Sequence, residues 1–178
     1  MMTKTIFAGF GGQGVLMMGY SYAHAAMNEG YEVTYLPSYG AEVRGGTANC
    51  TVAVSDDEIA SPIASEPDYL VVMNNPSLYT FQNRLTLGGV IFLNSSIIEA
   101  RPTRKDLEIC EIPAGEIATE LGNPRVQNIV VMGAYVKKTG LISPDAYLKS
   151  LKKIMGEKKK SIMDVNRKAF TAGYELLS

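Results

Sequence analysis

Cysteine and histidine are scarce in this sequence of 178 residues, which has two cysteines, one histidine and no tryptophan. An iron–sulfur cluster usually takes four thiolates, so Cys50 and Cys110 cannot hold one alone. We expect both to be buried, reduced thiols that pack as small hydrophobic residues. His24 falls on the side of an expected helix that faces away from its apolar stripe, which indicates a surface or interface residue. Because no other catalytic or metal-binding group stands out, we expect neither a catalytic residue nor a metal site.

A strong net charge and a long hydrophobic run are also missing. The chain has 17 basic and 18 acidic residues, a formal charge of −1, so composition gives no general attraction to nucleic acid or anionic lipid. Its longest apolar run, "IVVMGAYV" at 129–136, is far shorter than the roughly 20 residues of a membrane helix. The start of the chain lacks the apolar segment of a signal peptide. We expect a cytoplasmic protein that binds neither nucleic acid nor membrane.

The apolar patterns predict an α/β fold. A strand over 4–10, a helix over 14–29 and a strand over 31–37 form a βαβ unit, from which we expect a parallel sheet with a right-handed crossover. Further strands are expected at 47–55, 69–73, 88–94 and 107–112, the first of them with one wet or interface face. With 46% hydrophobic residues, the chain fits a single domain over 1–178. We expect a Rossmann-like three-layer fold, with a mostly parallel sheet and helices on both faces.

The C-terminal third is predicted to be helical. After a helix over 113–122, helices are expected at 126–140, 143–155 and 158–177, the last with four side chains inward: Ile162, Val165, Phe170 and Tyr174. Ser143 is the expected N-cap of its helix, and Asn75, before Pro76, is the expected N-cap of a helix after the fourth strand. The lysine-rich stretch 156–161 is interpreted as a solvated connection.

The turn after the first strand, "GFGGQGV", has the spacing of a dinucleotide-binding loop. Gly9 permits the turn, Gly11 lets backbone approach a phosphate, and Gly14 permits close helix packing, with Gly12 and Gln13 between them. The alternative is that the glycines serve only tight packing between strand and helix. Both readings remain open.

A nicotinamide cofactor would need an acidic residue at the end of the second strand, to bind the ribose hydroxyls. The sequence has Leu36, Pro37 and Ser38 there, and Glu32 falls at the wrong end of that strand. The turn therefore favours a Rossmann-type fold more strongly than it favours NAD or FAD.

A second glycine-rich segment, "SYGAEVRGG", follows the second strand. Gly45 and Gly46 supply backbone freedom, and Arg44 can bind a phosphate or carboxylate, or form an ion pair within the protein or across an interface. Tyr39 can form an aromatic wall or pack on the neighbouring helix. The loop after the fourth strand adds Asn74, and "NSS" follows the fifth. Because ligands gather at the carboxyl ends of strands in such sheets, we expect these loops to share one edge.

Six stretches of the sequence resemble, in order, the gamma subunit or gamma domain of 2-oxoacid:ferredoxin oxidoreductases. They are "GFGGQGV", "PSYGAEVRGGTANCTVAVSD", "PDYLVVMNNPSL", "GGVIFLNSS", "IPAGEIATELGNPRVQNIVVMGA" and "NRKAFTAG". The second stretch is specific to that family among Rossmann-like proteins. Together they cover nearly the whole chain.

The resemblance implies a complex that oxidatively decarboxylates a 2-oxoacid with coenzyme A (CoA) and passes two electrons to ferredoxin. Thiamine diphosphate with magnesium, and [4Fe-4S] clusters, are expected on its alpha, beta and ferredoxin-like delta subunits, since this chain lacks the thiamine diphosphate motif and the cluster cysteines. The chain alone is expected to be inactive and able to form a homodimer. Its expected role is assembly and contact with CoA, whose phosphates suit the Gly11–Gly14 backbone and Arg44.

The resemblance is strongest to the 2-oxoglutarate enzymes, with the branched-chain 2-oxoisovalerate enzymes next. Two hypotheses of other classes are a free-standing dinucleotide-binding oxidoreductase and a purely scaffolding module. Tight binding of NADH to the isolated chain would favour the first of these.

Overall fold

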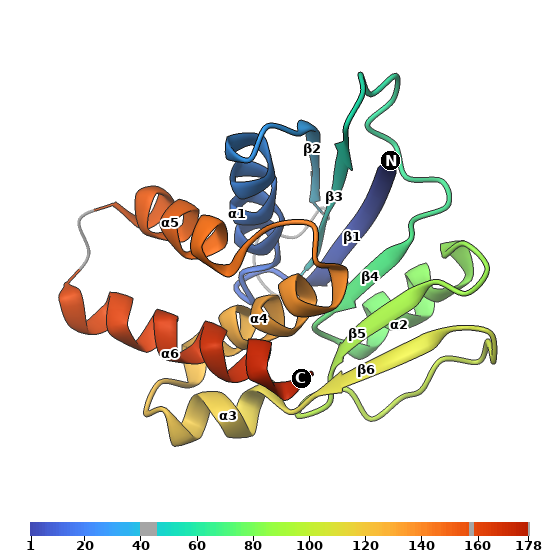
Figure 1. Ribbon diagram of the computed structural model, residues 1–178. Helices are drawn as coiled ribbons and strands as arrows, with labels where there is room; N and C mark the ends of the chain where they lie inside the picture. The colour runs from blue at the N-terminus through green and yellow to red at the C-terminus, as the bar shows by residue number, and fades with distance from the viewer. Residues whose placement is uncertain (40–45, 157–158, 178) are drawn as a thin grey trace.

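The computed structural model describes residues 1–39, 46–156 and 159–177, which form a six-stranded sheet with helices on both faces (Figure 1). The strands lie in the order β2-β3-β1-β4-β5-β6. Their bounds are Met2–Phe10 (β1), Glu32–Tyr39 (β2), Thr47–Ser55 (β3), Tyr69–Val72 (β4), Val90–Asn94 (β5) and Glu108–Ile112 (β6). The expected α/β fold is confirmed.

The sheet is mixed. β1, β4, β5 and β6 are parallel neighbours, whereas β3 pairs antiparallel with both β1 and β2. β2 thus runs in the direction of β1, as the βαβ unit predicts, but it lies at the edge of the sheet with β3 between the two strands. The reason is that β3 follows β2 through a short connection, which permits an antiparallel return, and matches β1 over nine residue pairs, Met2 with Ser55 to Phe10 with Thr47.

β3 lies between β2 and β1, and the face of this strand that was expected to be wet or at an interface is only partly exposed. Thr47 is exposed and Asn49 is half-buried, but Thr51 and Ser55 on the same face are buried. The polar face of 47–55 is therefore exposed at Thr47 and buried toward Ser55, and an interface at its exposed end stays a prediction.

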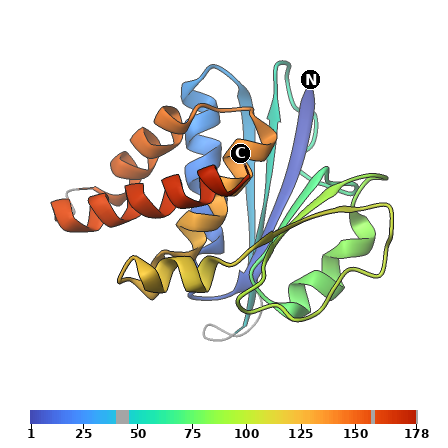
Figure 2. The same ribbon diagram turned by 60° about the horizontal axis from the view of Figure 1, so that its bottom comes forward.

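The helices form two unequal layers (Figure 2). One face of the sheet carries α1 (Val15–Asn28), α3 (Ala114–Glu120), α4 (Gln127–Thr139), α5 (Pro144–Met155) and α6 (Lys160–Leu176). The other face carries α2 (Asn75–Phe81), followed by the 3₁₀ turn η1 (Gln82–Arg84); a second turn, η2 (Pro124–Val126), precedes α4. The predictions of helices on both faces and of a helical C-terminal third are confirmed.

Each face of the sheet has its own hydrophobic core. Along β1, Phe7 packs into the core under α1 and α4, whereas Ile6 and Ala8 pack into the core under α2, as the two-residue period of a strand requires. In the first core the hydroxyl of Tyr135, which is fully buried, lies 2.6 Å from the Thr5 hydroxyl. Burial raises the pKa of Tyr135, so its hydroxyl stays protonated.

Two helix caps were predicted. Ser143 caps α5 as expected, because its hydroxyl accepts a hydrogen bond from the Ala146 amide (3.1 Å). The cap of α2 is Asn74 rather than Asn75: Asn74 has extended backbone, and its Oδ1 accepts from the Ser77 amide at 2.8 Å. In α6, Phe170 points inward as expected, but Ile162 is exposed, because it lies in the first turn, at the end of α6 remote from its crossing with α4 (Figure 1).

α4 and α6 cross at two glycines. A Cβ atom at Gly133 would overlap the carbonyl oxygen of Phe170, and one at Gly173 would overlap the carbonyl oxygen of Val130. The helix backbones are therefore in direct contact at this point. This contact fixes α6 over α4, and α4 begins at the candidate site.

Candidate functional site

The turn between β1 and α1 is anchored on both sides. The Gly11 amide donates a hydrogen bond to the carbonyl of Gly46, just before β3 (2.9 Å). The Gln13 side chain accepts from the Phe10 amide (2.7 Å) and donates to the carbonyl of Met73, just after β4 (2.9 Å). The turn is thus fixed to the ends of two strands that flank β1.

Two glycines of this turn adopt the left-handed conformation, Gly12 at φ 93° and Gly14 at φ 76°. A Cβ atom on Gly14 would overlap the side-chain amide of Asn128 in α4, and one on Gly9 would lie 2.6 Å from the Gln13 side-chain oxygen. Packing therefore accounts for Gly9 and Gly14. Gly12 differs, because a Cβ atom there would have no heavy atom of another described residue within 4 Å, apart from its chain neighbours. The turn is open at Gly12.

The same turn leaves the N-terminus of α1 without a cap. Gly14 is the N-cap residue and has no side chain to accept from the first amides of the helix, and the first turn contains no acidic residue. The first amides of any helix lack partners inside the helix, and they carry the positive end of its dipole. The end of this 14-residue helix is therefore suited to an anionic group.

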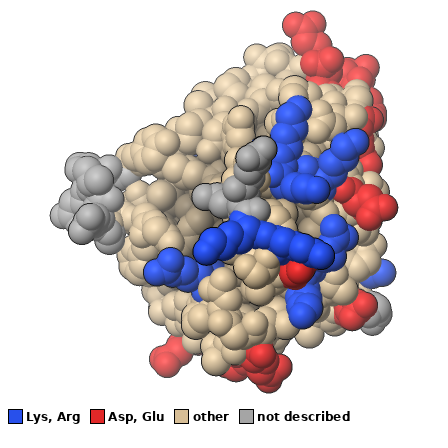
Figure 3. All heavy atoms as spheres, turned by 90° about the vertical axis from the view of Figure 1, so that its left-hand side faces the viewer, with Lys and Arg blue, Asp and Glu red and all other residues tan. Residues whose placement is uncertain are grey.

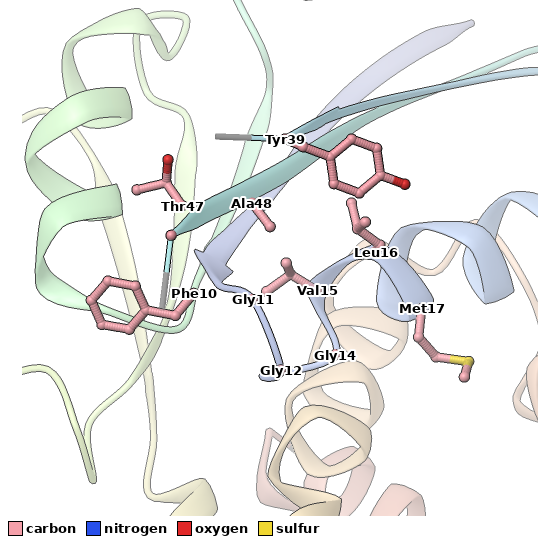
Figure 4. Close-up of a pocket in the computed structure, with 11 residues that line it drawn as sticks. Phe10, Gly11, Gly12, Gly14, Val15, Leu16, Met17, Tyr39, Thr47 and Ala48 are labelled. Carbon is pink, nitrogen blue, oxygen red and sulfur yellow. The ribbon is translucent and has the colours of Figure 1, made fainter. Parts of the chain in front are cut away.

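A pocket of about 510 Å³ lies on the β2 and β3 side of the turn (Figure 4). Tyr39 and Leu16 stand on one side of it and Phe10 and Thr47 on the other, above the Gly11–Gly14 backbone. We call it the Tyr39 pocket; its lining is Phe10, Gly11, Gly12, Gly14, Val15, Leu16, Met17, Tyr39, Gly46, Thr47 and Ala48. Its walls are mostly apolar, and Tyr39 is 71% exposed, so its side chain can contact a guest.

A second pocket, of about 490 Å³, lies on the other side of the turn. We call it the Arg125 pocket; its lining is Gly12, Gln13, Gly14, Met73, Ile97, Pro124, Arg125, Gln127 and Asn128. It opens where β1 and β4 meet, the position in the sheet where successive connections run in opposite directions. In open α/β sheets this is the usual place for a ligand.

Arg125 supplies the positive charge of this pocket. Its side chain is exposed and makes no hydrogen bond or ion pair within residues 1–39, 46–156 and 159–177. The segment that carries it is well held: Asn94, at the end of β5, donates to the Gln127 side chain (3.0 Å), which donates to the Pro124 carbonyl (3.1 Å). An arginine on a fixed backbone beside an uncapped helix terminus can bind a phosphate or a carboxylate.

The structure brings several of the predicted residues together. Both pockets are lined by Gly12 and Gly14. The Tyr39 pocket is also lined by Gly11, Tyr39 and Gly46. Gln13 lines the Arg125 pocket, and its side chain holds the turn in place. Gly9 lies beneath the turn. Arg44 and Gly45 lie outside the residues that the structure describes.

Asn74 is a predicted site residue that lines neither pocket. It is buried, and its Oδ1 caps α2. Of the "NSS" loop, Ser96 accepts from the Gly115 amide (2.8 Å) and donates to the Glu116 carboxylate, while the neighbouring Ile97 lines the Arg125 pocket. The loops after the strands therefore meet at one edge of the sheet, as predicted, but only some of the predicted residues line a pocket there.

Sequence reasoning missed Arg125, Gln127 and Asn128, although they lie in a stretch that supports the family resemblance. The sequence around Arg125 does contain a local indication of a site. "GNPRVQN" places an Asn and a Pro before a helix, and its arginine has no acidic residue within one helical turn. Nothing in the sequence, however, brings this segment beside the turn 11–14, which is more than one hundred residues away.

The remaining polar candidates are structural. Cys50 and Cys110 are free and buried, as expected, and burial raises the pKa of Cys50 to about 12. His24 is half-buried and lies 3.2 Å from the Ser150 hydroxyl on α5. In the described ranges, no three His, Cys, Asp or Glu side chains gather in a way that could hold a metal ion. No helix there is long and apolar enough to cross a bilayer.

Comparison with known proteins identifies the family. The pyruvate ferredoxin/flavodoxin oxidoreductase family matches residues 4–176, almost the entire chain. The chain belongs to this family. The membership expected from the six motifs is confirmed.

Relatives of two kinds illustrate the likeness. The chain is 38% identical to the ketoisovalerate oxidoreductase subunit VorA of Methanothermobacter thermautotrophicus, over 94% of this chain and 35% of that protein. It is 34% identical to the 2-oxoglutarate synthase subunit KorC of Methanothermobacter marburgensis, over 99% of this chain and 97% of that protein. The chain thus spans about a third of the length of VorA but nearly all of KorC.

Solved structures share the fold. The keto/oxoacid ferredoxin oxidoreductase gamma subunit of Geobacter sulfurreducens matches with a TM-score of 0.82 at 27% identity, over 98% of both chains. The 2-oxoglutarate:ferredoxin oxidoreductase of Magnetococcus marinus, solved with 2-oxoglutarate, coenzyme A and succinyl-CoA bound, matches with a TM-score of 0.91 at 23% identity, over 99% of this chain and 31% of that one. Both agree with the α/β architecture described above.

Proposed function

We propose that residues 1–178 form one gamma domain of a 2-oxoacid:ferredoxin oxidoreductase, and that its part in the reaction is to bind CoA. The reaction converts a 2-oxoacid and CoA into an acyl-CoA and carbon dioxide, with two electrons passed to ferredoxin. The family match over residues 4–176 supports the assignment. The cytoplasm, where ferredoxin and CoA are available, is the proposed location.

One observation carries the role in CoA binding: the uncapped N-terminus of α1 lies between an apolar pocket and a pocket with an arginine that pairs with none of the described residues. CoA has matching parts, namely an adenine ring, a pyrophosphate with a further ribose phosphate, and an apolar pantetheine arm. The pyrophosphate suits the open backbone at Gly12 and the first amides of α1. The Arg125 guanidinium suits a phosphate, which it can contact with two N–H groups. The Tyr39 pocket suits the adenine ring.

The other cofactors are assigned to partner subunits. The residues present do not fit an iron–sulfur cluster, because the only two cysteines are buried on separate strands, β3 and β6, and burial keeps the thiol of Cys50 protonated. We therefore propose that thiamine diphosphate, magnesium and [4Fe-4S] clusters are held by alpha, beta and ferredoxin-like delta subunits. The domain described here then supplies binding and orientation of CoA, with the redox chemistry performed elsewhere.

For the 2-oxoacid itself we propose 2-oxoglutarate, with 2-oxoisovalerate as the alternative. The KorC subunit of the 2-oxoglutarate enzyme matches this chain over nearly its entire length, whereas the subunit of the ketoisovalerate enzyme is the more identical of the two over the shared part. The keto acid reacts on thiamine diphosphate, so the choice of substrate rests with the partner subunits.

The test is purification of the chain, with an affinity tag, from its native cells. We expect partner subunits with thiamine diphosphate and iron–sulfur clusters to co-purify, and the assembly to reduce ferredoxin with 2-oxoglutarate and CoA. The isolated chain should be inactive. Activity of the isolated chain with NADH, or a purified assembly that turns over without CoA, would contradict the proposal.

A further inference from the structure

Charge is divided unequally along this chain. Residues 144–178 contain eight basic and four acidic residues, a formal charge of +4, whereas residues 1–143 contain nine basic and fourteen acidic residues, a formal charge of −5. The near-neutral total therefore conceals a positive segment, which forms α5 and α6. A positive face of this kind attracts negatively charged partners.

The basic residues of α5 and α6 gather on one face of the molecule, where Figure 3 shows Lys and Arg side chains close together with few acidic ones among them. A groove of about 660 Å³ runs between the two helices. Lys149 and Lys152 of α5 line it from one side, and Lys160 and Arg167 of α6 from the other. We call it the α5–α6 groove.

The groove has an apolar component and a fixed base. Half-buried Leu148 and Met163 are part of its lining. Beneath it, the Tyr147 ring of α5 stacks on the Phe170 ring of α6 with centroids 4.9 Å apart, and the Asn166 amide donates to the sulfur of Met155 (3.1 Å). The two rows of cations are therefore held at a set spacing by packed side chains.

Within the described ranges, the four cations that line the groove form no ion pair. The ion pairs found in the part of the chain that the structure describes have Met1, Arg101, Arg104 and Lys138 as their cations, and none of these lines the groove. The dipole of α5 accounts for lysines in its last turn, Lys152 and Lys153. It does not account for Arg167, in the middle of α6, or for cations of two helices that face one groove.

We infer that the α5–α6 groove is a docking surface for an acidic segment of another protein, with carboxylates that contact the two rows of cations and an apolar side chain that covers Leu148 and Met163. Charge complementarity of this kind steers association and fixes the register of the partner. A nucleic acid fits less well, because Asp145 and Asp164 also line the groove, because no aromatic ring there could stack on a base, and because the rest of the chain is negative.

The inference can be tested with the full-length chain and labelled peptides, by fluorescence anisotropy. The first probe is a short peptide of glutamates interrupted by two leucines, and the second has serines in place of the leucines. A lysine peptide with the same leucines and a single-stranded oligonucleotide complete the set. We expect the glutamate–leucine peptide to bind most tightly, with an affinity that falls at least tenfold between about 50 and 300 mM NaCl, because exposed charges are screened by salt.

Variants locate the binding. Lys152→Glu and Arg167→Glu, both exposed and therefore compatible with folding, should each weaken binding of this peptide about fivefold or more. Lys105→Glu changes the net charge by the same amount at an exposed position ahead of β6, and it should change the affinity less than twofold. An equal loss with Lys105→Glu, equal binding of the leucine and serine peptides, or tighter binding of the oligonucleotide would overturn the inference.

Discussion

The side-chain amide of Gln13 joins the glycine-rich turn to the carbonyl of Met73 at the end of β4 (2.9 Å), while its oxygen accepts from the Phe10 amide (2.7 Å). One side chain thus connects the ends of two neighbouring parallel strands and sets the floor of the Arg125 pocket. We expect Gln13→Ala to lower the free energy of unfolding by about 1–2 kcal/mol, since it removes both hydrogen bonds. Urea unfolding measures this loss.

Gln13→Glu is the matched variant. It keeps an acceptor for the Phe10 amide but cannot donate to the Met73 carbonyl. Its stability should therefore fall between those of the wild type and Gln13→Ala. If Gln13→Ala unfolded at the same urea concentration as the wild type, the side chain would not hold the turn.

Gly14 and Gly12 are both left-handed, but only Gly14 contacts another element. Alanine at either position should lower the free energy of unfolding by about 1–2 kcal/mol, because a residue with a Cβ atom disfavours the left-handed backbone conformation. At Gly14 the overlap with Asn128 should add about 1–3 kcal/mol. Thermal unfolding of Gly14→Ala, Gly12→Ala and Gly14→Ala with Asn128→Ala separates the two contributions. The double variant should regain the stability lost to the overlap with Asn128 but not the stability lost to the backbone conformation. Equal stability of Gly14→Ala and Gly12→Ala would show that residue 14 does not contact Asn128.

The glycine contact between α4 and α6 reverses the usual effect of helix propensity. Gly→Ala inside a helix normally stabilises by about 1 kcal/mol. For Gly173→Ala we expect a loss of at least about 2 kcal/mol, because the new methyl group would overlap the Val130 carbonyl. Ser161→Ala, at an exposed position of the same helix, serves as the control and should be neutral or slightly stabilising. A stabilised Gly173→Ala protein would mean that the helices are further apart than described.

One surface ion pair gives a dependence on pH. The Arg104 guanidinium donates to the Asp106 carboxylate (3.0 and 2.5 Å), and with the Gly88 amide it lowers the pKa of Asp106 to about 2, from an ordinary value of 3.8. Because the folded-state pKa is depressed, the stabilisation is present above about pH 4 and is lost as the pH falls toward 2.

Asp106→Asn should therefore be less stable than the wild type at neutral pH, and the difference should shrink as the pH falls from about 4 to 2. Unfolding by urea across this range measures it. A difference that stayed constant with pH would show that the carboxylate is not stabilised by Arg104.

The elements of this fold follow from the periods of the sequence, but the order of the strands does not. Buried runs such as 69–72 and 90–94 identify strands locally, and their glycine and proline boundaries are local too. Whether β1 pairs with β2 or with β3 depends on how many residues each pairing can match, and this is a property of the whole sheet. The position of the α2 cap, Asn74 rather than Asn75, depends on where the extended backbone of β4 ends.

The candidate site was likewise predictable only in part. The turn 11–14 carries its own signal, since glycine at fixed spacing after a strand is required by local backbone geometry. Arg125 reaches the same place through the packing of α4 and through the Asn94–Gln127 hydrogen bond. No local pattern encodes such a contact. The role proposed for Arg44 stays a prediction, because this residue lies outside the described ranges.

The central claim is that the turn and Arg125 bind the phosphates of CoA, and steady-state kinetics of the assembled complex test it most directly. Arg125→Ala should raise the KM for CoA about tenfold or more while kcat and the KM for the 2-oxoacid change little, since the proposed contact of the arginine is with the part of CoA that does not react. Lys105→Ala, exposed ahead of the amino end of β6 and so at the opposite edge of the sheet, is the control and should leave all constants unchanged. An assembled Arg125→Ala complex with the KM for CoA of the wild type would contradict the account.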